Sequence, residues 1–532
     1  MTRDYPLLSE IEEFKNAISD KNTDSILNMI SQHPLKYFYN LKLEDRYGLN
    51  LFHIIILMDL TQMFNKVTEI LIQRFNDEKK NKENGLVENN SSKDENSKMS
   101  LVDLLSIPDK EGNSPILYAA FRGNIDIVNS LINLGVSYEV KNFAGLDIIH
   151  MAAQNNKENI IVYFKEKYNF DIFKSDNEGN TSIHWASSTG GKNALDFLLF
   201  YIDEKYGNLE VINKVNDKGQ NALQLTIMTN QSTSACKKLI KKGIDYNNKD
   251  INSLTVFDIV KNDKKLENIK NLLYTYTHRN CFGLNYHIND PLNKYFKLVA
   301  FIILINFLLY MVIFEFFPFL QEFTGDIKII KLIFYLLSVP LVIGYFYMMY
   351  SDPGIIKEKI NSSLLELVEK KFDIKKLCPY CMVEKKDQNC KHCFICNVCI
   401  EYFDHHCHWI NNCIGNGNKM QFIAFLLVLV SNLFISCLIA LKVFLLGVEK
   451  EKKIGYFMGD YYHRKFSSLT VMILILIFFW PICYILYVQT RQKKKKSAAM
   501  EETRKEVQDY YEELKQINDQ NNVLNRLQIK DG

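Results

Sequence analysis

A short phrase returns along the first half of the chain at a nearly constant spacing. Gly112, Gly145 and Gly179 are 33 and 34 residues apart, and a step of 40 residues leads to Gly219. Each glycine follows an Asp or Asn by two or three positions and precedes an apolar run. A period of this length indicates a stack of small units, each of which buries its apolar face only against its neighbours.

The phrase resembles the ankyrin repeat. Its glycine permits the tight turn before the first helix, and small pairs such as Ala119 and Ala120 let the helices approach closely. The resemblance implies an all-α ankyrin-repeat solenoid over residues 1–285, with six or seven units. Residues 76–100 are rich in Asn, Lys, Glu and Ser, and we predict a disordered insertion there.

His53, His150 and His184 fall at one position of the repeat. A histidine at this place in an ankyrin unit usually hydrogen-bonds the turn. We therefore expect a structural role for all three rather than a catalytic or ligand-binding one.

Four apolar stretches follow the repeats, at 298–320, 332–350, 422–446 and 469–489. Each is close to the ~20 residues that cross a bilayer as a helix. One such stretch could be a buried helix of a soluble protein, but four in succession favour a four-helix transmembrane bundle. Transmembrane helices 1 and 2 are expected within 298–350, and helices 3 and 4 within 421–490.

The Lys and Arg residues that flank these spans predict the orientation of the chain. Lysines are frequent in the 351–420 loop and at the start of the charged 491–532 tail, whereas the 321–331 loop has only two. The 447–468 loop carries five basic residues, which weakens the asymmetry without reversing it. The repeats, the first of these loops and the tail are therefore expected in the cytosol, in a multi-pass protein of the Golgi or another endomembrane.

Eight of the twelve cysteines lie between residues 378 and 413, where three Cys-x-x-Cys steps alternate with histidines. Residues 1–20 are charged and lack the apolar core of a secretory signal, so metal binding is favoured over a disulfide framework. Each step aims two thiolates at one ion, and the residues suffice for two closed tetrahedral zinc sites with a cysteine to spare. Zinc binding requires reduced thiols, which agrees with a cytosolic location.

Within this segment, the run Asp404-His405-His406-Cys407 follows the three steps and lies between the second and third apolar stretches. The arrangement resembles the DHHC-type palmitoyltransferases, which are protein S-acyltransferases, and the repeats resemble those of the family's ankyrin-repeat branch. Further matches are an Asp-Pro-Gly element and a downstream Asn and aromatic residue, here Asp352-Pro353-Gly354, Asn418 and Phe422. A cytosolic DHHC cysteine-rich zinc domain is thus expected over 351–420.

The resemblance implies two structural Zn²⁺ ions with four protein ligands each. The first ion would be held by Cys378, Cys381, His392 and Cys399, and the second by Cys393, Cys396, His406 and Cys413. Cys407 is then left free. Cys390 lies in a stretch that is one residue longer than the family's usual spacing, and it is an alternative ligand for the first ion.

The same resemblance implies a two-step reaction. Cys407 would accept palmitate or a similar acyl group from a fatty acyl-CoA, such as palmitoyl-CoA, and a cysteine of a substrate protein would then take it. His405 is the nearest candidate base, and Asp404 could orient its ring. The acyl chain would lie among the four spans, where its burial is worth ~0.8 kcal/mol per CH₂.

The repeats would recruit the protein substrates, while a formal net charge of +3 gives no indication of a nucleic-acid partner. Deletion of residues 1–285 is then expected to spare self-acylation and to reduce transfer to substrates.

Some features depart from the family pattern. His408 stands where proline is usual before Trp409, and no Thr-Thr-x-Glu element is recognisable after the last span. Many ankyrin-repeat members also have two further spans.

The same sequence allows two other interpretations: a membrane-anchored ankyrin scaffold whose zinc sites are only structural, and an ankyrin-bearing channel. Four spans without a re-entrant segment disfavour the channel.

Overall fold

The computed structural model describes residues 8–44, 46–83, 100–205, 210–261, 263–277, 291–387, 389–454 and 463–487. The chain divides into two compact units. The first contains residues 1–288 and 358–387, and the second contains residues 289–357 and 388–532.

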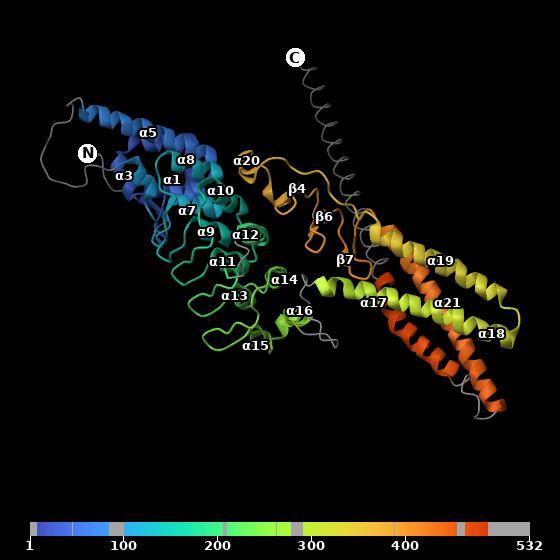
Figure 1. Ribbon diagram of the computed structural model, residues 1–532. Helices are drawn as coiled ribbons and strands as arrows, with labels where there is room; N and C mark the ends of the chain where they lie inside the picture. The colour runs from blue at the N-terminus through green and yellow to red at the C-terminus, as the bar shows by residue number, and fades with distance from the viewer. Residues whose placement is uncertain are drawn as a thin grey trace, which may run out of the picture. The chain divides into compact units, whose positions relative to one another are not determined.

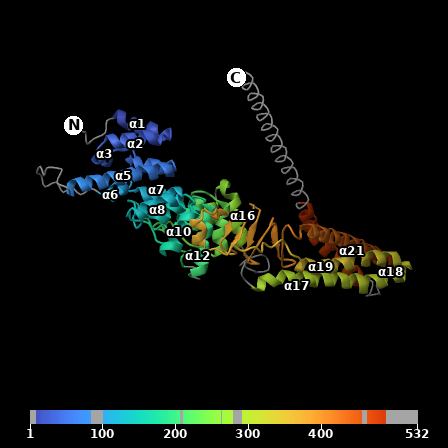
Figure 2. The same cartoon turned by 90° about the horizontal axis from the view of Figure 1, so that it is seen from above.

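The first unit consists of short helices, most of them paired, that follow one another in sequence and in space (Figures 1 and 2). The helices before the repeated phrase are α1 (Leu8–Ser19), α2 (Thr23–Gln32) and α3 (Leu35–Asn40), and an antiparallel pair of strands, β1 (Lys42–Glu44) and β2 (Leu49–Asn50), leads into the first repeat. The helices of the repeats are α4 (Leu51–Leu57), α5 (Thr61–Glu83), α6 (Leu101–Ser106), α7 (Pro115–Arg122), α8 (Ile125–Asn133), α9 (Ile148–Gln154), α10 (Glu158–Tyr168), α11 (Ser182–Ser188), α12 (Lys192–Lys205), α13 (Ala222–Met228), α14 (Thr233–Lys242), α15 (Val256–Val260), the 3₁₀ turn η2 (Lys264–Leu266) and α16 (Glu267–Thr277).

The first helices of the repeats pack against one another in chain order, from α4 through α7, α9, α11 and α13 to α15. Small, fully buried residues such as Ala119, Ala120, Ala152 and Ala153 lie in these helices, which allows their close approach. This neighbour-to-neighbour packing confirms the predicted all-α ankyrin solenoid.

The three repeat histidines lie at the third position of α4, α9 and α11 and are almost completely buried. One ring nitrogen of His53 accepts the N–H of Asn50 at 3.1 Å, and the other bonds the carbonyl of Asn113 at 3.0 Å. His184 does the same with the N–H of Thr181 at 3.1 Å and the carbonyl of Gln220 at 3.2 Å. Each histidine therefore ties the start of its helix to a following turn, which is the structural role expected from its place in the repeat.

The second helix of the first repeat, α5, continues through Glu83 and so includes residues 76–83, which composition had placed in a disordered insertion. Glu and Lys favour helix nearly as strongly as Ala, and this preference extends the helix into the charged stretch. Residues 84–99 of the predicted insertion lie outside the described residues.

Residues 358–387 belong to the first unit although they follow the second apolar span in sequence. They form the helix α20 (Leu364–Glu369), the 3₁₀ turn η4 (Ile374–Lys376) and a hairpin of β3 (Leu377–Cys378) with β4 (Val383–Glu384). Apolar side chains of α20 lie in the same buried core as the repeats. The part of the chain that begins the cysteine-rich segment is therefore packed on the ankyrin solenoid.

The second unit contains four described helices that are long and apolar enough to cross a membrane, namely Leu298–Thr324, Lys328–Tyr350, Lys419–Val448 and His463–Tyr487. The first comprises α17 (Pro291–Tyr310), a π-helical turn η3 (Met311–Phe316) and α18 (Phe317–Thr324); the second is α19 (Lys328–Tyr350), and the third is part of α21 (Lys419–Ile454). They confirm the four predicted spans. The charged tail from 491 onward lies outside the described residues.

Two features join these helices. The helices α19 and α21 pack against each other, and Asn432 Nδ2 donates to Ser338 Oγ across them at 2.7 Å. Such a bond favours helix association in lipid, where the amide has no water as an alternative partner. In the first span, the π-turn immediately precedes Pro318, whose ring cannot fit under a regular helical turn.

Candidate active site

Three short antiparallel hairpins carry the cysteine-rich motifs. They are β3 with β4, β5 (Lys391–Cys393) with β6 (Val398–Ile400), and β7 (His405–Cys407) with β8 (Asn412–Ile414). In two Cys-x-x-Cys steps the next residue closes the turn: Met382 N–H donates to Cys378 O at 2.9 Å, and Asn397 N–H to Cys393 O at 2.7 Å. Both residues have φ of 54°. This tight turn directs the two thiols of each step to one side.

The first group that the structure brings together contains one pair of thiols, an imidazole and a third thiol. Its members are Cys378, Cys381, His392 and Cys399, whose ligand atoms all lie within 4.8 Å of one another. His392 and Cys399 face each other across β5 and β6, with Nδ1 3.9 Å from Sγ.

The second group has the same composition and the same spread of 4.8 Å, and it consists of Cys393, Cys396, His406 and Cys413. His406 Nδ1 lies 3.3 Å from Cys396 Sγ and 3.5 Å from Cys413 Sγ, and these two sulfurs are 3.4 Å apart. Hydrogen bonds from its neighbours lower the pKa of the Cys393 thiol, and the same crowding raises that of Cys413. Thiolates this close repel one another, so a cation among them would favour their ionised forms.

Both groups are compatible with zinc. Bond lengths of about 2.3 Å to sulfur and about 2.0 Å to nitrogen put tetrahedral ligand atoms about 3.5–3.8 Å apart. The separations of 3.3–3.9 Å around His406 and His392 are close to these values. Cys390 is buried but belongs to neither group, so the structure gathers the four-ligand sets that the family resemblance implies without it.

Cys407 is also outside both groups. It ends β7, opposite Asn412 on β8, and its side chain is 8% exposed. It belongs to the same buried apolar cluster as residues of the spanning helices, including Phe301, Tyr345, Phe422 and Phe425. The β7–β8 hairpin therefore places the Cys407 thiol, which belongs to neither Cys/His group, in the apolar core of the helix bundle.

The side chain of His405 interacts with both Asp404 and Cys407. Its Nδ1 is 3.7 Å from Asp404 Oδ1, an ion-pair distance rather than a hydrogen bond. Burial alone would lower the pKa of His405, but the interactions with Asp404 and Cys407 outweigh it and raise the pKa to about 9. The imidazolium form of His405 therefore persists beside the Cys407 thiol.

Lys419 was not singled out in the sequence. Its Nζ lies 2.8 Å from Asp404 Oδ2, at the first residue of α21. Asp404 also donates its N–H to the carbonyl of Ile414 at 2.9 Å. Lys419 on the helix thus holds the carboxylate, and the hairpin holds the backbone of the same residue. A lysine fifteen residues downstream of an aspartate carries no signal of this pairing in sequence.

Asn412 is another residue that the sequence did not point to. Its Nδ2 donates to Met348 O at 3.0 Å and to Ser351 O at 2.8 Å, both at the end of α19. Tyr345 adds a bond from its hydroxyl to Trp409 O at 3.1 Å. These bonds fasten the β7–β8 hairpin to the second span.

The Asp-Pro-Gly element and Asn418 serve the same junction. The Asp352 carboxylate accepts the N–H groups of Gly354 and Ile355 at 2.8 and 3.0 Å. In the same turn, the carbonyl oxygen of Pro353 accepts the N–H of Gly417 at 3.2 Å. Asn418 is fully buried. Its amide bonds Gly415 N–H, Cys413 O and Ser351 Oγ at 2.9–3.1 Å.

Aromatic rings surround the hairpin tip. Trp409 lies 5.6 Å from Phe301 and 6.4 Å from Phe478, and the ring of Phe422 is 5.8 Å from His405. His408, which replaces the family's proline, packs its ring 4.9 Å from that of His406.

Comparison with known proteins agrees with this arrangement. Residues 371–506 match the model of the DHHC palmitoyltransferase family, and residues 116–210 and 149–250 match that of ankyrin repeats. The chain combines a DHHC palmitoyltransferase domain with ankyrin repeats. This confirms the resemblance drawn from the sequence.

Among curated proteins, the palmitoyltransferase ZDHHC17 of Danio rerio is 41% identical over 101 residues, which are 18% of this chain and 16% of that protein. ZDHHC17 of Homo sapiens is 40% identical over 104 residues, 19% of this chain and 16% of that protein. Palmitoyltransferase swf1 of Schizosaccharomyces pombe is 39% identical over 127 residues, 23% of this chain and 35% of that protein. The matches thus span between about a sixth and a third of these relatives' own lengths.

Proposed function

We propose that this chain is a multi-pass membrane protein S-acyltransferase that acts through an acyl thioester on Cys407. The observation that carries the proposal is the place of this thiol: it belongs to neither four-ligand group, it interacts with His405, which also interacts with Asp404, and it lies in the apolar core of the helix bundle. The match to the DHHC palmitoyltransferase domain supports the same reaction.

In the first step, the Cys407 thiolate attacks the thioester carbonyl of a fatty acyl-CoA such as palmitoyl-CoA. The new S–C bond forms as the bond to the CoA sulfur breaks, and the His405 imidazolium gives its proton to the departing CoA thiolate. In the second step, neutral His405 takes the proton of a substrate cysteine. That thiolate then attacks the Cys407 thioester and restores the free enzyme.

Asp404 keeps the imidazolium beside the nucleophile and counters its charge. The acyl chain would lie among the spans, where the aromatic and aliphatic neighbours of Cys407 exclude water from the thioester. Burial of the chain at ~0.8 kcal/mol per CH₂ makes a membrane-embedded site favourable for long acyl groups.

The two Cys/His groups would hold structural zinc ions. Four ligands close each site, so bound zinc would brace the hairpins rather than activate water. Since Cys407 is not a ligand, its thiolate keeps its nucleophilicity. The distances around His406 and His392 support this assignment of Cys378, Cys381, His392 and Cys399 to one ion and of Cys393, Cys396, His406 and Cys413 to the other.

Ankyrin repeats generally bind other proteins, and we propose that these repeats recruit the substrates whose cysteines are acylated. The lysine-rich 351–420 loop favours a cytosolic location of the repeats and the cysteine-rich segment, in the Golgi or another endomembrane.

The test is self-acylation of the purified full-length protein with labelled palmitoyl-CoA. The wild type should form an adduct that hydroxylamine removes, and Cys407→Ser should form none. Cys390→Ser is the matched control, because Cys390 is also a buried cysteine outside both metal groups, and it should keep the adduct. An adduct at the wild-type level in Cys407→Ser would show that another residue carries the acyl group, and no adduct in the wild type would favour the zinc-braced scaffold.

A further inference from the structure

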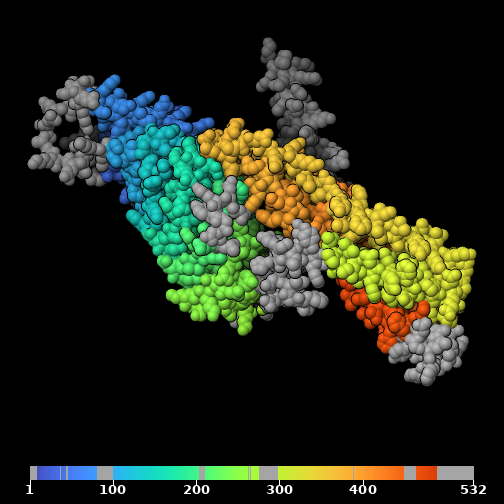
Figure 3. Space-filling view, in the orientation of Figure 1, coloured from blue at the N-terminus to red at the C-terminus, as the bar shows by residue number. Residues whose placement is uncertain are grey.

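The segment that leads into the cysteine-rich motifs lies along the second helices of three consecutive repeats. Figure 3 shows its gold and orange surface against the blue-green surface of the repeats. Its helix α20 and its turn η4 pack against α10. Further along, the ring of Tyr380 meets the ring of Phe200 on α12 edge-on, with centroids 5.4 Å apart. Lys242 of α14 places its Nζ 6.0 Å from the centroid of the same tyrosine ring.

The contact is apolar at its centre. Leu367 and Val368 of α20 are 5% and 4% exposed, Ile374 of η4 is 2% exposed, and Leu377 of β3 is 1% exposed. All four belong to the core cluster that also contains the buried residues of the repeats. A six-residue helix cannot bury this face by itself, so the repeats supply its partner surface.

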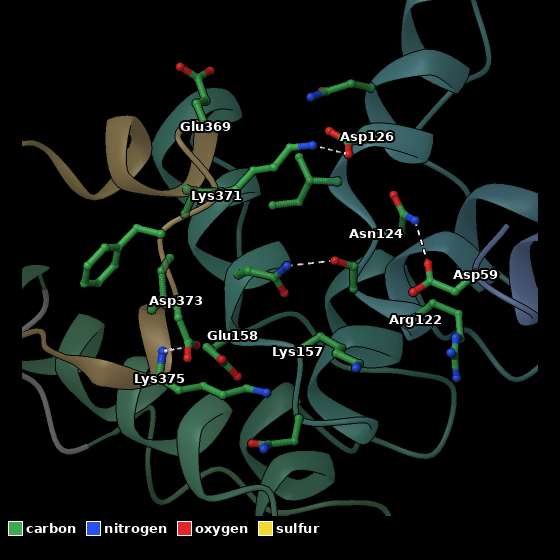
Figure 4. A pocket seen from close by; sticks show the side chains of 18 residues that line it. Asp59, Arg122, Asn124, Asp126, Lys157, Glu158, Glu369, Lys371, Asp373 and Lys375 are labelled. Carbon is green, nitrogen blue, oxygen red and sulfur yellow. Dashed lines mark hydrogen bonds and ion pairs between the residues drawn. The ribbon is translucent and has the colours of Figure 1, made fainter. Parts of the chain in front are cut away.

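Polar groups define the edge of the contact. Lys371 Nζ reaches Asp126 Oδ2 at 2.7 Å, across the rim of a hollow of about 550 Å³ that is lined by both the segment and the repeats (Figure 4). Lys167 of α10 lies 3.6 Å from Glu369 of α20. Both ion pairs are exposed and add little stability, but they constrain how the segment lies on the repeats.

Tyr380 sits inside the first Cys-x-x-Cys step, directly before Cys381. Its packing on α12 therefore bears on the turn that aims Cys378 and Cys381 at one point. We propose that the ankyrin repeats have a second, internal role, in which α10, α12 and α14 hold residues 364–380 and thereby position the first Cys-x-x-Cys turn of the cysteine-rich segment.

Two consequences follow. Because this part of the second helices is covered by the chain itself, substrate proteins must dock on another face of the repeats. Removal of the repeats would also expose Leu367, Val368, Ile374 and Leu377. Deletion of residues 1–285 is then expected to impair self-acylation as well as transfer, instead of sparing it. The expected loss of self-acylation in this deletion rests on the proposed function, whereas the contact between the segment and the repeats does not.

The test measures hydrogen exchange over residues 364–384 in the full-length protein, which requires no acylation activity. Leu367→Asp should break the contact at α20, and Phe200→Ala should break it from the side of the repeats. Each should raise exchange over 364–384 by on the order of tenfold, including the Met382 N–H that bonds Cys378 O, while α9 and α11 keep their protection.

Two matched variants complete the test. Glu366→Asp puts the same new side chain on the exposed face of α20 and keeps the charge there, and Phe200→Tyr keeps the ring that meets Tyr380; both should behave as the wild type. The proposal is overturned if Leu367→Asp and Phe200→Ala leave exchange over 364–384 unchanged. It is also overturned if exchange in α9 and α11 rises as much as exchange over 364–384. The contact between residues 364–380 and the repeats would then serve only to stabilise the repeats.

Discussion

The ammonium group of Lys419 lies 2.8 Å from Oδ2 of Asp404, while the other carboxylate oxygen of Asp404 faces Nδ1 of His405 at 3.7 Å. The aspartate side chain is only 15% exposed, so solvent screens these interactions weakly. Lys419 opens the third span, and this pair links the membrane helix to the residue that orients the proposed base. The position of the base thus depends on how the helix enters the membrane.

We expect Asp404→Asn to slow formation of the Cys407 adduct by on the order of 10²–10⁴, the usual contribution of a positioned acid–base group. The amide cannot stabilise the His405 imidazolium, so the thiolate loses its counter-charge. Lys419→Met should cause a smaller loss, because Asp404 keeps its backbone anchor at Ile414. Single-turnover adduct formation measures both effects. Lys419→Arg preserves the cation, and a rate as low as that of Lys419→Met would contradict the ion-pair role.

Metal content gives a second prediction. The full-length protein should contain two zinc ions per chain, measured by elemental analysis, because both Cys/His groups have tetrahedral spacing. Cys396→Ser should lose one ion, whereas Cys390→Ser should retain both. Retention of two ions in Cys396→Ser would show that another residue completes the second site.

Much of this architecture follows from local sequence patterns. The repeats and the spans are periodic or continuous over tens of residues, and the Cys-x-x-Cys steps form their turns locally. Contacts made by single residues over long separations were not predictable. Asn412 bonds the end of α19 more than sixty residues earlier, and α20 is too short to show an amphipathic period. The burial of α20 becomes evident only when the structure shows the repeats packed against it.

The sequence matches Asn418 to a position of the family pattern, but only its contacts in the structure show its structural role. It is fully buried, and its amide joins Gly415, Cys413 and Ser351. Asn418→Ala should destabilise the junction of the β7–β8 hairpin with the spans by on the order of 3 kcal/mol, because several buried partners lose their bonds. Faster hydrogen exchange over 405–418 would report it.

Asn418→Asp keeps the acceptor for Gly415 N–H but loses the two donations and sets a buried carboxylate against the Cys413 carbonyl. An effect at least as large as that of alanine is expected. If the alanine variant exchanges like the wild type, the junction is held by Asn412 and Tyr345 alone.

The buried repeat histidines predict a pH dependence of the ankyrin unit. Burial lowers the pKa of His53 and of His184 to about 4, although the bonds to the Asn113 and Gln220 carbonyls oppose the shift. In the unfolded chain both histidines titrate near 6.5. The unfolded state therefore takes up more protons between these values, so stability is complete above about pH 6.5 and falls as the pH drops toward 4.

At pH 5, each histidine should cost on the order of 2 kcal/mol of folding stability relative to pH 7. Hydrogen exchange of α7–α13, corrected for intrinsic rates, measures the loss. His184→Gln should remove its share, because Gln224 already fills the same place in the next repeat and accepts the N–H of Asn221 at 3.1 Å. The converse change, Gln224→His, should add a similar sensitivity. Equal pH dependence in all three proteins would mean that other groups, such as the paired Asp147 and His150, govern acid unfolding.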